Sequence, residues 1–466
     1  MNQKKRKRYL VTYADQDIDS SKASSILGVT KSKTKEGVSF METDSTPKKD
    51  DVLHFSKLGI SSIELDDEEH SKLAKKKEVL AVEEDTEVHI LELSAEEEQL
   101  ERFNSSISEA GYDTNGSYDE GYRNAMMDLF SSMLQMGTRE QTSGSGGYGP
   151  VLPVPRNPIL RPIPRKPFPW RPPVLRKQPV PWNISMINAP AAWNRGYKGS
   201  GVKVAVLDTG IANHNDLTIS GGASFVSGVS SYDDGHSHGT HCAGIIGARN
   251  NFIGVVGVAP LCSLYAVKVL SDSGSGYSSW VIAGMDWCIQ NDIQVASMSL
   301  GSSTAPSTAY ANAVRKCQEA GVTVVTSAGN SGNSSSFPWV GSPANAYQRS
   351  NSNASPIAVG AVNQSSNIAS FSSRDGDHSE WNRVTVVAPG VDVNSTVLNN
   401  GYDEKTGTSM ACPHVAGLAA LLYEKYPGIS PINVERRITA SASDLGAAGF
   451  DEPHGYGLIN CDLATA

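Results

Sequence analysis

Three residues far apart in this chain of 466 residues carry the side chains needed to turn a hydroxyl group into a nucleophile. Asp208 follows the apolar run Val204–Leu207, and His238 and Ser409 each stand at the start of an expected helix. A serine hydroxyl is inert near neutral pH unless a base takes its proton, and an imidazole has a suitable pKa. A buried carboxylate beside the imidazole fixes its tautomer. The three residue types therefore indicate a serine activated by an imidazole and a carboxylate.

A fourth polar residue, Asn330, ends the expected strand before it and offers an amide N–H. Such a donor could complete an oxyanion hole, together with the backbone N–H groups at the helix start that carries Ser409. Each residue also has an ordinary structural interpretation. Asp208 could form a turn, His238 could cap a helix and Ser409 could be an N-cap.

The four segments, in the order Asp, His, Asn and Ser, resemble those of the subtilisin-like serine proteases over about residues 177–466, including the closing run 455–460. The resemblance implies a serine endopeptidase in which Asp208 orients His238 and His238 acts as general base and then acid. It also implies that Ser409 is the nucleophile and that Asn330 stabilises the oxyanion. His241 and His414 belong to the same motifs but are expected to be structural hydrogen-bonding residues.

These side chains must be positioned by an α/β framework. Apolar, β-branched runs alternate with helical stretches over residues 177–466, which favours a mostly parallel central sheet between two layers of helices. This agrees with the three-layer fold that the resemblance implies, and sites in such folds lie at the carboxyl ends of the strands. The expected strands are 202–207, 263–270, 295–300, 322–327, 357–362 and 384–388, and the expected helices are 239–248, 278–291, 307–320 and 409–426.

The resemblance also implies a substrate cleft with two edges, between which an extended peptide would add as a strand. Broad specificity follows, because backbone pairing ignores side chains. Gly329 and Gly341 would leave room for a large apolar residue before the scissile bond, although Gly341 could equally be a turn glycine. The implied substrate-binding residues are Gly274, Ser275, Gly276, Ser299, Leu300, Gly301 and Gly329.

A calcium site is a further implication of the resemblance. Its ligands would be oxygens, as Ca²⁺ requires. They would come from the side chains of Gln178, Asp216 and Asn251 and from the carbonyl groups of Arg249, Ile253 and Val255.

Residues 1–91 differ in composition from the rest of the chain, because they are rich in charged residues. Their short strand-like runs and an expected helix over 67–78 predict a small α+β domain. This part resembles the inhibitory propeptide of the same family, with Val82–Asp85 near its end. The resemblance implies a zymogen that inhibits itself and cuts itself after Leu91.

Residues 92–176 are acidic at first and then rich in Gly and Pro, with ten prolines between Pro150 and Pro173. Proline at that density supplies few backbone donors and favours an extended chain. We expect a linker that either stays attached to the enzyme as a flexible N-terminal extension or is removed by a second cut, and we favour a cut near Arg176 and Lys177. Its Pro-x-x-Pro spacings leave open an adaptor for polyproline-binding modules.

The composition narrows the alternatives. Forty basic and 49 acidic residues give a net charge of −9, which argues against non-specific nucleic-acid binding. No apolar run reaches the length of about 18 residues expected of a membrane span. No secretory apolar segment follows the basic cluster at the N-terminus, so we expect a cytoplasmic protein, with export by a non-standard route as the alternative.

The six cysteines form no Cys-x-x-Cys pair, and Cys242 is expected to be a small buried residue rather than a reactive thiol. The expected partners are protein or peptide substrates and the protein's own propeptide. A non-catalytic binding protein on the same scaffold would have lost a member of the triad, and none is lost.

Overall fold

The computed structural model describes residues 6–15, 17–42, 51–99, 101–102, 178–346, 355–375 and 383–466. The described residues up to 102 and those from 178 onward belong to one compact unit. The proline-rich stretch expected to be an extended linker lies outside the described residues, and so does the expected second cut near Lys177. None of the described helices is long and apolar enough to cross a membrane.

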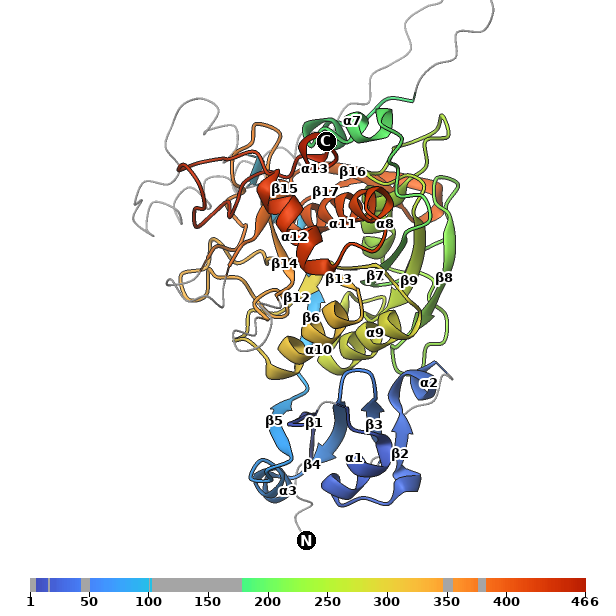
Figure 1. Ribbon diagram of the computed structural model, residues 1–466. Helices are drawn as coiled ribbons and strands as arrows, with labels where there is room; N and C mark the ends of the chain where they lie inside the picture. The colour runs from blue at the N-terminus through green and yellow to red at the C-terminus, as the bar shows by residue number, and fades with distance from the viewer. Residues whose placement is uncertain are drawn as a thin grey trace, which may run out of the picture. The chain divides into compact units, whose positions relative to one another are not determined.

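A seven-stranded parallel sheet forms the centre of residues 178–466 (Figure 1). Every strand pairing recorded within it is parallel, as the alternation of strands and helices predicts. In spatial order the strands are β15 (Val386–Pro389), β14 (Ile357–Val362), β13 (Thr323–Ser327), β11 (Val295–Met298), β7 (Lys203–Asp208), β9 (Ser263–Lys268) and β8 (Ile219–Ser224).

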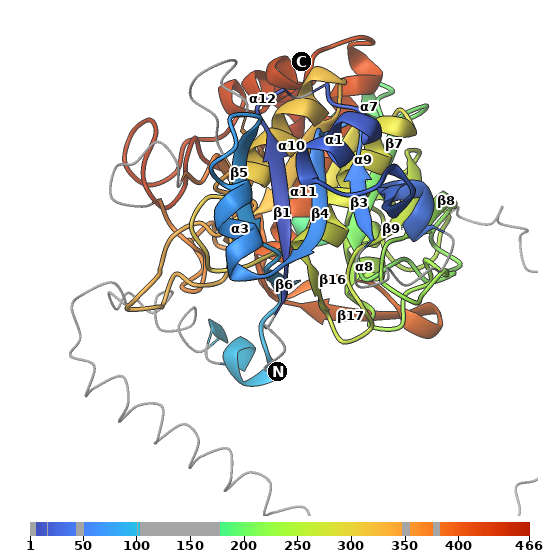
Figure 2. The same cartoon turned by 90° about the horizontal axis from the view of Figure 1, so that it is seen from below.

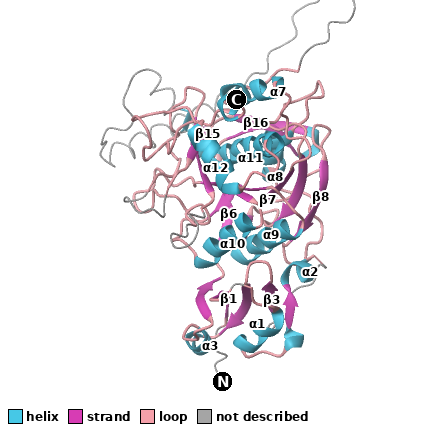
Figure 3. Ribbon diagram, viewed as in Figure 1, coloured by secondary structure: helices cyan, strands magenta, loops and turns pink. Residues whose placement is uncertain are grey.

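Helices pack on both faces of this sheet (Figure 3). Side chains alternate between the faces of a strand, and β7 shows the result. Val204 and Val206 pack in one core with α8 (His238–Gly247) and α11 (Thr408–Lys425). Ala205 and Leu207 pack in the other with α9 (Ser278–Gln290) and α10 (Thr308–Glu319). The predicted three-layer α/β fold is therefore confirmed. Peripheral elements are α6 (Trp182–Met186), α7 (Ala189–Asn194), α12 (Pro431–Ala440), α13 (Cys461–Ala464) and the hairpin of β16 (Val393–Val397) and β17 (Gly401–Lys405).

Residues 6–85 form a smaller sheet with helices, which we call the N-terminal module. Its strand order is β2 (Thr34–Glu36), β3 (Val52–Phe55), β4 (Ile60–Leu65), β1 (Lys7–Tyr13) and β5 (Val79–Glu84). The helices are α1 (Ser20–Leu27), α2 (Gly37–Met41) and α3 (Asp67–Leu73). The expected helix over 67–78 is thus too long. It ends at Leu73 because the chain must turn to let Val79 pair with Tyr13 on β1.

The two faces of the module have different neighbours. Tyr9, Val11 and Tyr13 point into the module's own core beneath α1 and α3. Leu10 and Phe55 pack in the same core as α9 and α10, and Figure 2 shows the strands of the module over these two helices. The module therefore rests on the helices that flank the large sheet.

The strand β6 (Glu87–Ile90) leaves the module and joins the larger part of the molecule. It lies between β10 (Ser275–Tyr277) and β12 (Leu300–Gly301), antiparallel to both. Its partners come from the two edges that the resemblance assigns to a substrate cleft.

Candidate active site

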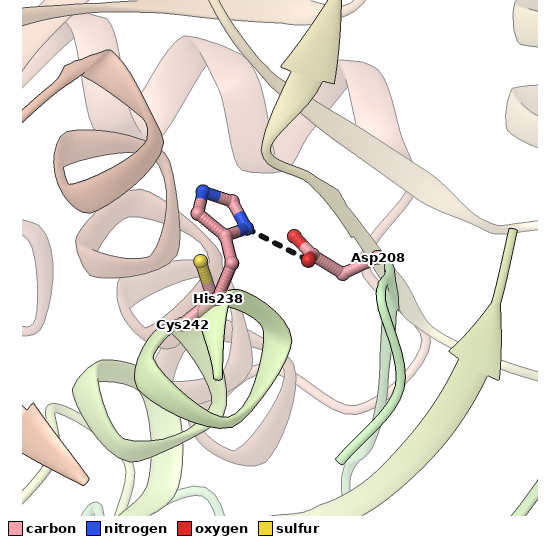
Figure 4. A group of neighbouring side chains, drawn as sticks. All are labelled: Asp208, His238 and Cys242. Atoms are coloured by element: carbon pink, nitrogen blue, oxygen red, sulfur yellow. Dashed lines mark hydrogen bonds and ion pairs between the residues drawn. The ribbon is translucent and has the colours of Figure 1, made fainter. Parts of the chain in front are cut away.

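The Asp208 carboxylate and the His238 imidazole meet at the carboxyl edge of the large sheet (Figure 4). Asp208 is the last residue of β7 and His238 the first of α8, and neither side chain is exposed to solvent. Asp208 Oδ1 lies 2.7 Å from His238 Nδ1. Burial lowers the pKa of His238, but the neighbouring carboxylate outweighs it, so the pKa lies above its ordinary value. His238 Nε2 has no hydrogen-bond partner among the described residues and is free to accept a proton.

Asp234 holds this pair in place, and our sequence interpretation missed it. Its carboxylate accepts hydrogen bonds from Thr209 Oγ1 at 2.9 Å, from Ser237 N at 3.0 Å and from Thr240 N at 2.9 Å. These bonds join the loop after β7 to the first turn of α8. The sequence contained a signal for this role. Asp side chains often accept hydrogen bonds from backbone N–H groups two or three residues ahead, and Asp234 stands three residues before Ser237, the residue that precedes α8.

Ser409 lies in the first turn of α11, close to the same helix α8. Its hydroxyl donates to Ser299 O at 3.1 Å, and its own carbonyl accepts from Ser299 Oγ at 2.9 Å. The same carbonyl lies 3.5 Å from the sulfur of Cys242, one turn after His238. The sulfur, the His238 ring and the Asp208 carboxylate offer atoms within 4.8 Å of one another. The backbone of Ser409 therefore lies against α8, one turn from His238, while its hydroxyl is bonded to Ser299.

The Asn330 amide is oriented by its own oxygen. Asn330 Oδ1 accepts from Thr408 N at 3.0 Å and from Thr408 Oγ1 at 2.8 Å. The buried Asn330 Nδ2 is thereby turned to the other side, where it has no partner among the described residues. A Cβ atom on Gly407 would lie 3.2 Å from this nitrogen and 2.3 Å from the carbonyl oxygen of Leu91. Only glycine at position 407 lets that carbonyl approach the Asn330 donor.

Leu91 sits directly on Ser409. Its carbonyl accepts a hydrogen bond from Ser409 N at 3.3 Å, and its own N–H points to Ser409 Oγ at 3.1 Å. Its side chain borders a cavity that is also lined by Gly301, Gly329 and Gly341. The Leu91 carbonyl thus faces two donors beside a serine hydroxyl, which is the arrangement that attack on a carbonyl requires.

The seven predicted substrate-binding residues surround the chain that leads to Leu91. Ile90 N donates to Gly274 O at 3.0 Å, and His89, Val88 and Ile90 are paired with β10 and β12. The structure therefore places these residues together: Gly274, Ser275 and Gly276 on one edge, Ser299, Leu300 and Gly301 on the other, and Gly329 at the Leu91 side chain.

The predicted calcium ligands also come together. Gln178 Nε2 donates to Ile253 O at 2.7 Å and to Val255 O at 2.6 Å, so both carbonyl groups converge on one point. Asp216 Oδ2 accepts from Val255 N at 3.0 Å, while its buried Oδ1 has no hydrogen-bond partner in the described structure. Burial raises the pKa of Asp216. An orphaned carboxylate oxygen beside converging carbonyl groups fits a hard cation.

The rest of this loop is tied to the same residues. Arg249 N donates to Asp216 O at 2.9 Å, and Asn251 Oδ1 accepts from Ile253 N at 3.2 Å. Gln178 Oε1 accepts from Asn251 N at 2.8 Å. To present this oxygen to a cation, the amide has to turn over, because its nitrogen now faces the two carbonyl groups.

The remaining polar residues of the motifs are structural. His241 Nε2 lies 2.9 Å from Val393 O, and His414 Nδ1 lies 2.8 Å from Met410 O, as predicted for hydrogen-bonding residues. Burial lowers the pKa of His241 to about 3 and that of His414 to about 4, so both rings are neutral. Burial raises the pKa of the Cys242 thiol well above its ordinary value, so the thiol is not a reactive thiolate.

Comparison with known proteins agrees with this geometry. The model of the Subtilase family matches residues 199–457. The chain is 48% identical over 289 residues to Subtilisin DY of Bacillus licheniformis, which covers 62% of this chain and 99% of that protein. It is 49% identical over 290 residues to Subtilisin E of Bacillus subtilis (strain 168), which covers 62% of this chain and 72% of that one. It is 48% identical over 288 residues to Subtilisin Savinase of Lederbergia lenta, and this match covers 62% of this chain and 99% of that protein. The chain belongs to the subtilase family and is a serine endopeptidase of the subtilisin type.

Proposed function

We propose that this endopeptidase cleaves peptide bonds with Ser409 as nucleophile, His238 as base and acid, and Asp208 as the group that orients His238. Asn330 Nδ2 and Ser409 N form the oxyanion hole. The observation that carries this proposal is the position of Leu91, whose carbonyl lies 3.3 Å from Ser409 N and faces the Asn330 amide. The peptide bond after Leu91 therefore occupies the place of a scissile bond.

The chemistry follows from these contacts. The Ser409 hydroxyl turns from Ser299 O toward His238 Nε2, gives up its proton and attacks the carbonyl carbon. Negative charge develops on the carbonyl oxygen, where the two fixed N–H donors stabilise it. His238 then protonates the leaving amine, and a water molecule hydrolyses the acyl-enzyme by the same steps in reverse. Asp208 keeps its hydrogen bond to His238 Nδ1 and stabilises the imidazolium that forms each time.

The N-terminal module is proposed to be an intramolecular inhibitor, so that the enzyme is made as a zymogen. Glu83 supports this, because its two carboxylate oxygens accept from Thr308 N at 2.9 Å and Ala309 N at 2.8 Å at the start of α10. Asp85 accepts from Ser279 N at 2.8 Å and from its hydroxyl at 2.6 Å at the start of α9. Carboxylates at helix N-termini are stabilising. These contacts hold the module while β6 fills the cleft.

The same arrangement supports the expected preference for a large apolar residue before the scissile bond. The glycines at positions 301, 329 and 341 leave space for the Leu91 side chain. A Cβ atom on Gly301 would lie 3.2 Å from Leu91 Cδ1, so a larger residue there would narrow the cavity.

We also propose that Gln178, Asp216 and the 249–255 loop bind Ca²⁺, which would neutralise the buried Asp216 and stabilise the fold. The domain boundaries at 91 and 177 and the compartment stay predictions.

Replacing the nucleophile tests the proposed triad. Ser409→Ala should lose about 10⁶-fold in kcat, the size measured when the nucleophile of a subtilisin is removed. Asn330→Ala should lose about 10²–10³-fold, as measured for the oxyanion-hole asparagine of a subtilisin. Hydrolysis of a peptide p-nitroanilide, in which Leu precedes the scissile bond, measures both, with Ser230→Ala at an exposed position as the control. Wild-type kcat in Ser409→Ala would exclude this serine as the nucleophile.

The pH dependence of kcat/KM tests the role of His238. The neutral imidazole is the base, and the Asp208 carboxylate raises the pKa of His238 above 6.5. Activity should therefore be full above that pKa and fall as the pH is lowered through it. A pH–rate profile of the processed enzyme shows the midpoint. A rate that stays constant down to pH 4 would rule out His238 as the base.

Self-cleavage is tested by comparing the wild type with Ser409→Ala, each expressed without other proteases. The wild type should yield a chain that begins at Glu92, whereas Ser409→Ala should stay joined at Leu91–Glu92, because the bond lies in its own active site. Leu91→Asp should slow the cut, since its charge would enter an apolar cavity. N-terminal sequencing and mass spectrometry identify the products, and equal processing of Ser409→Ala would refute self-cleavage.

Chelation tests the calcium site. A ligand that binds only the folded state contributes about 2.7 kcal/mol at a hundredfold excess over its Kd. EDTA should therefore lower the Tm of wild-type protein by several degrees, and Asp216→Asn should remove most of this difference. The matched control is Asp292→Asn at an exposed position. Identical melting curves for wild type with CaCl₂ and with EDTA would contradict the site.

A further inference from the structure

The chain does not leave the active site after the Leu91–Glu92 bond. Leu93 N donates to Thr406 O at 2.9 Å, three residues before Ser409. The Leu93 side chain is 8% exposed and belongs to the core that contains α8 and α11. Burying a leucine side chain contributes about 1.5–3 kcal/mol. The side of the cleft that binds residues following the scissile bond, the primed side, is therefore occupied.

A helix follows, and its start is encoded locally. Residues 95–99 and 101–102 are helical. Ser94 N donates to Glu97 Oε2 at 2.8 Å and Glu97 N to Ser94 Oγ at 3.4 Å, the reciprocal pattern of a capping box. The helix can therefore form wherever residues 92–102 dock, and we call these residues the primed-side segment.

One face of this helix is anchored by two acids, the half-buried Glu98 and the buried Glu101. Glu98 Oε1 accepts from Thr406 N at 3.0 Å. Glu101 is 4% exposed and accepts from Ser370 N at 3.1 Å and from the Ser370 hydroxyl. Burial raises the pKa of both carboxyl groups. Arg102 Nε completes the contact with Asp392 Oδ1 at 2.8 Å.

Glu92, the first residue of the segment, makes the contact nearest to the catalytic groups. Its carboxylate lies 2.5 Å from Lys405 Nζ, and the two side chains are 16% and 11% exposed. Both charges act on the His238 imidazole, since Glu92 raises its pKa and Lys405 lowers it. Removing one member of so sheltered a pair leaves the other charge uncompensated, which is costly. Lys405 and Glu92 therefore favour the docked state.

None of these contacts depends on the bond between Leu91 and Glu92. Hydrolysis consumes one water molecule and leaves a carboxylate on Leu91 and an amino group on Glu92. The N-terminal module then becomes a separate chain that dilution can remove. The primed-side segment remains covalently joined to the enzyme, so its rebinding stays intramolecular.

We propose that the surface formed by Ser370, Asp392, Lys405 and Thr406 is a docking site for residues 92–102, which remain bound after the Leu91–Glu92 bond is cut and keep extended substrates out of the primed side. The proposal rests on the zymogen function proposed above. The cut after Leu91 would open only the unprimed side of the cleft, which β6 fills. Full activity on proteins would also require loss of the primed-side segment.

Two substrates separate the two sides of the cleft during processing of the full-length chain. A short peptide methyl ester ending in Leu needs only the unprimed side, whereas a quenched fluorescent peptide of about eight residues spans both. Mass spectrometry follows the chain that begins at Glu92. In the wild type, ester hydrolysis should rise as residues 1–91 are lost, and cleavage of the spanning peptide should lag until residues 92–102 are lost. Before residues 92–102 are lost, the KM for the spanning peptide should be about tenfold higher than after their loss. This factor equals about 1.4 kcal/mol of competing docking energy.

The double variant Glu98→Ala/Glu101→Ala should abolish the lag, with ester hydrolysis unchanged. The control Glu96→Ala, at an exposed position of the same helix, should keep the lag, and Glu101→Gln, which retains an acceptor for Ser370, should shorten it only in part. Simultaneous appearance of both activities in the wild type, or an equal lag in the double variant, would overturn the docking proposal while leaving the zymogen intact. If no chain beginning at Glu92 forms, the zymogen proposal itself fails, and the docking proposal fails with it.

Discussion

A carboxylate and an imidazole held 2.7 Å apart without solvent contact impose the main requirement on this fold. A charge at that depth is tolerated only when its partner and its hydrogen bonds are fixed, because desolvation costs several kcal/mol per ion. The parallel sheet meets this requirement by ending β7 at Asp208 and starting α8 at His238 across the same edge. Asp234 then joins the two segments through Thr209 and Thr240, so the pair is held by backbone rather than by side chains alone.

A second theme is the use of backbone N–H groups as partners for acids. Glu83 and Asp85 are bound by the first N–H groups of α10 and α9, and Glu98 and Glu101 by the N–H groups of Thr406 and Ser370. The catalytic part therefore binds acidic segments of its own chain without needing a basic surface. This explains how a chain of net charge −9 can hold so many carboxylates at an internal interface.

The sequence predicted the strands best where burial is complete. The expected strand 357–362 coincides with β14, whose six residues are all buried. Apolar, β-branched runs leave little alternative in such places. Prediction failed where local sequence is neutral. The helix α1 is rich in serine and depends on the Asp19 cap and the left-handed Gly28, and β8 contains two adjacent glycines. Their conformations follow from pairing and packing with distant residues, which no local pattern contains.

The sequence by itself predicted the chemistry, because Asp208, His238, Asn330 and Ser409 each carry a distinctive side chain at the end of an expected strand or the start of an expected helix. The resemblance that these residues carry also predicted the two cleft edges and the oxygen ligands around Asp216. Only the tertiary structure decided what occupies the cleft. Backbone pairing is indifferent to residue type, so nothing in Glu87–Ile90 alone shows that it pairs with Ser275–Tyr277 and Leu300–Gly301. The burial of Leu93 and Glu101 is likewise a property of surfaces that are assembled from distant segments, and it exists only once those segments are folded together.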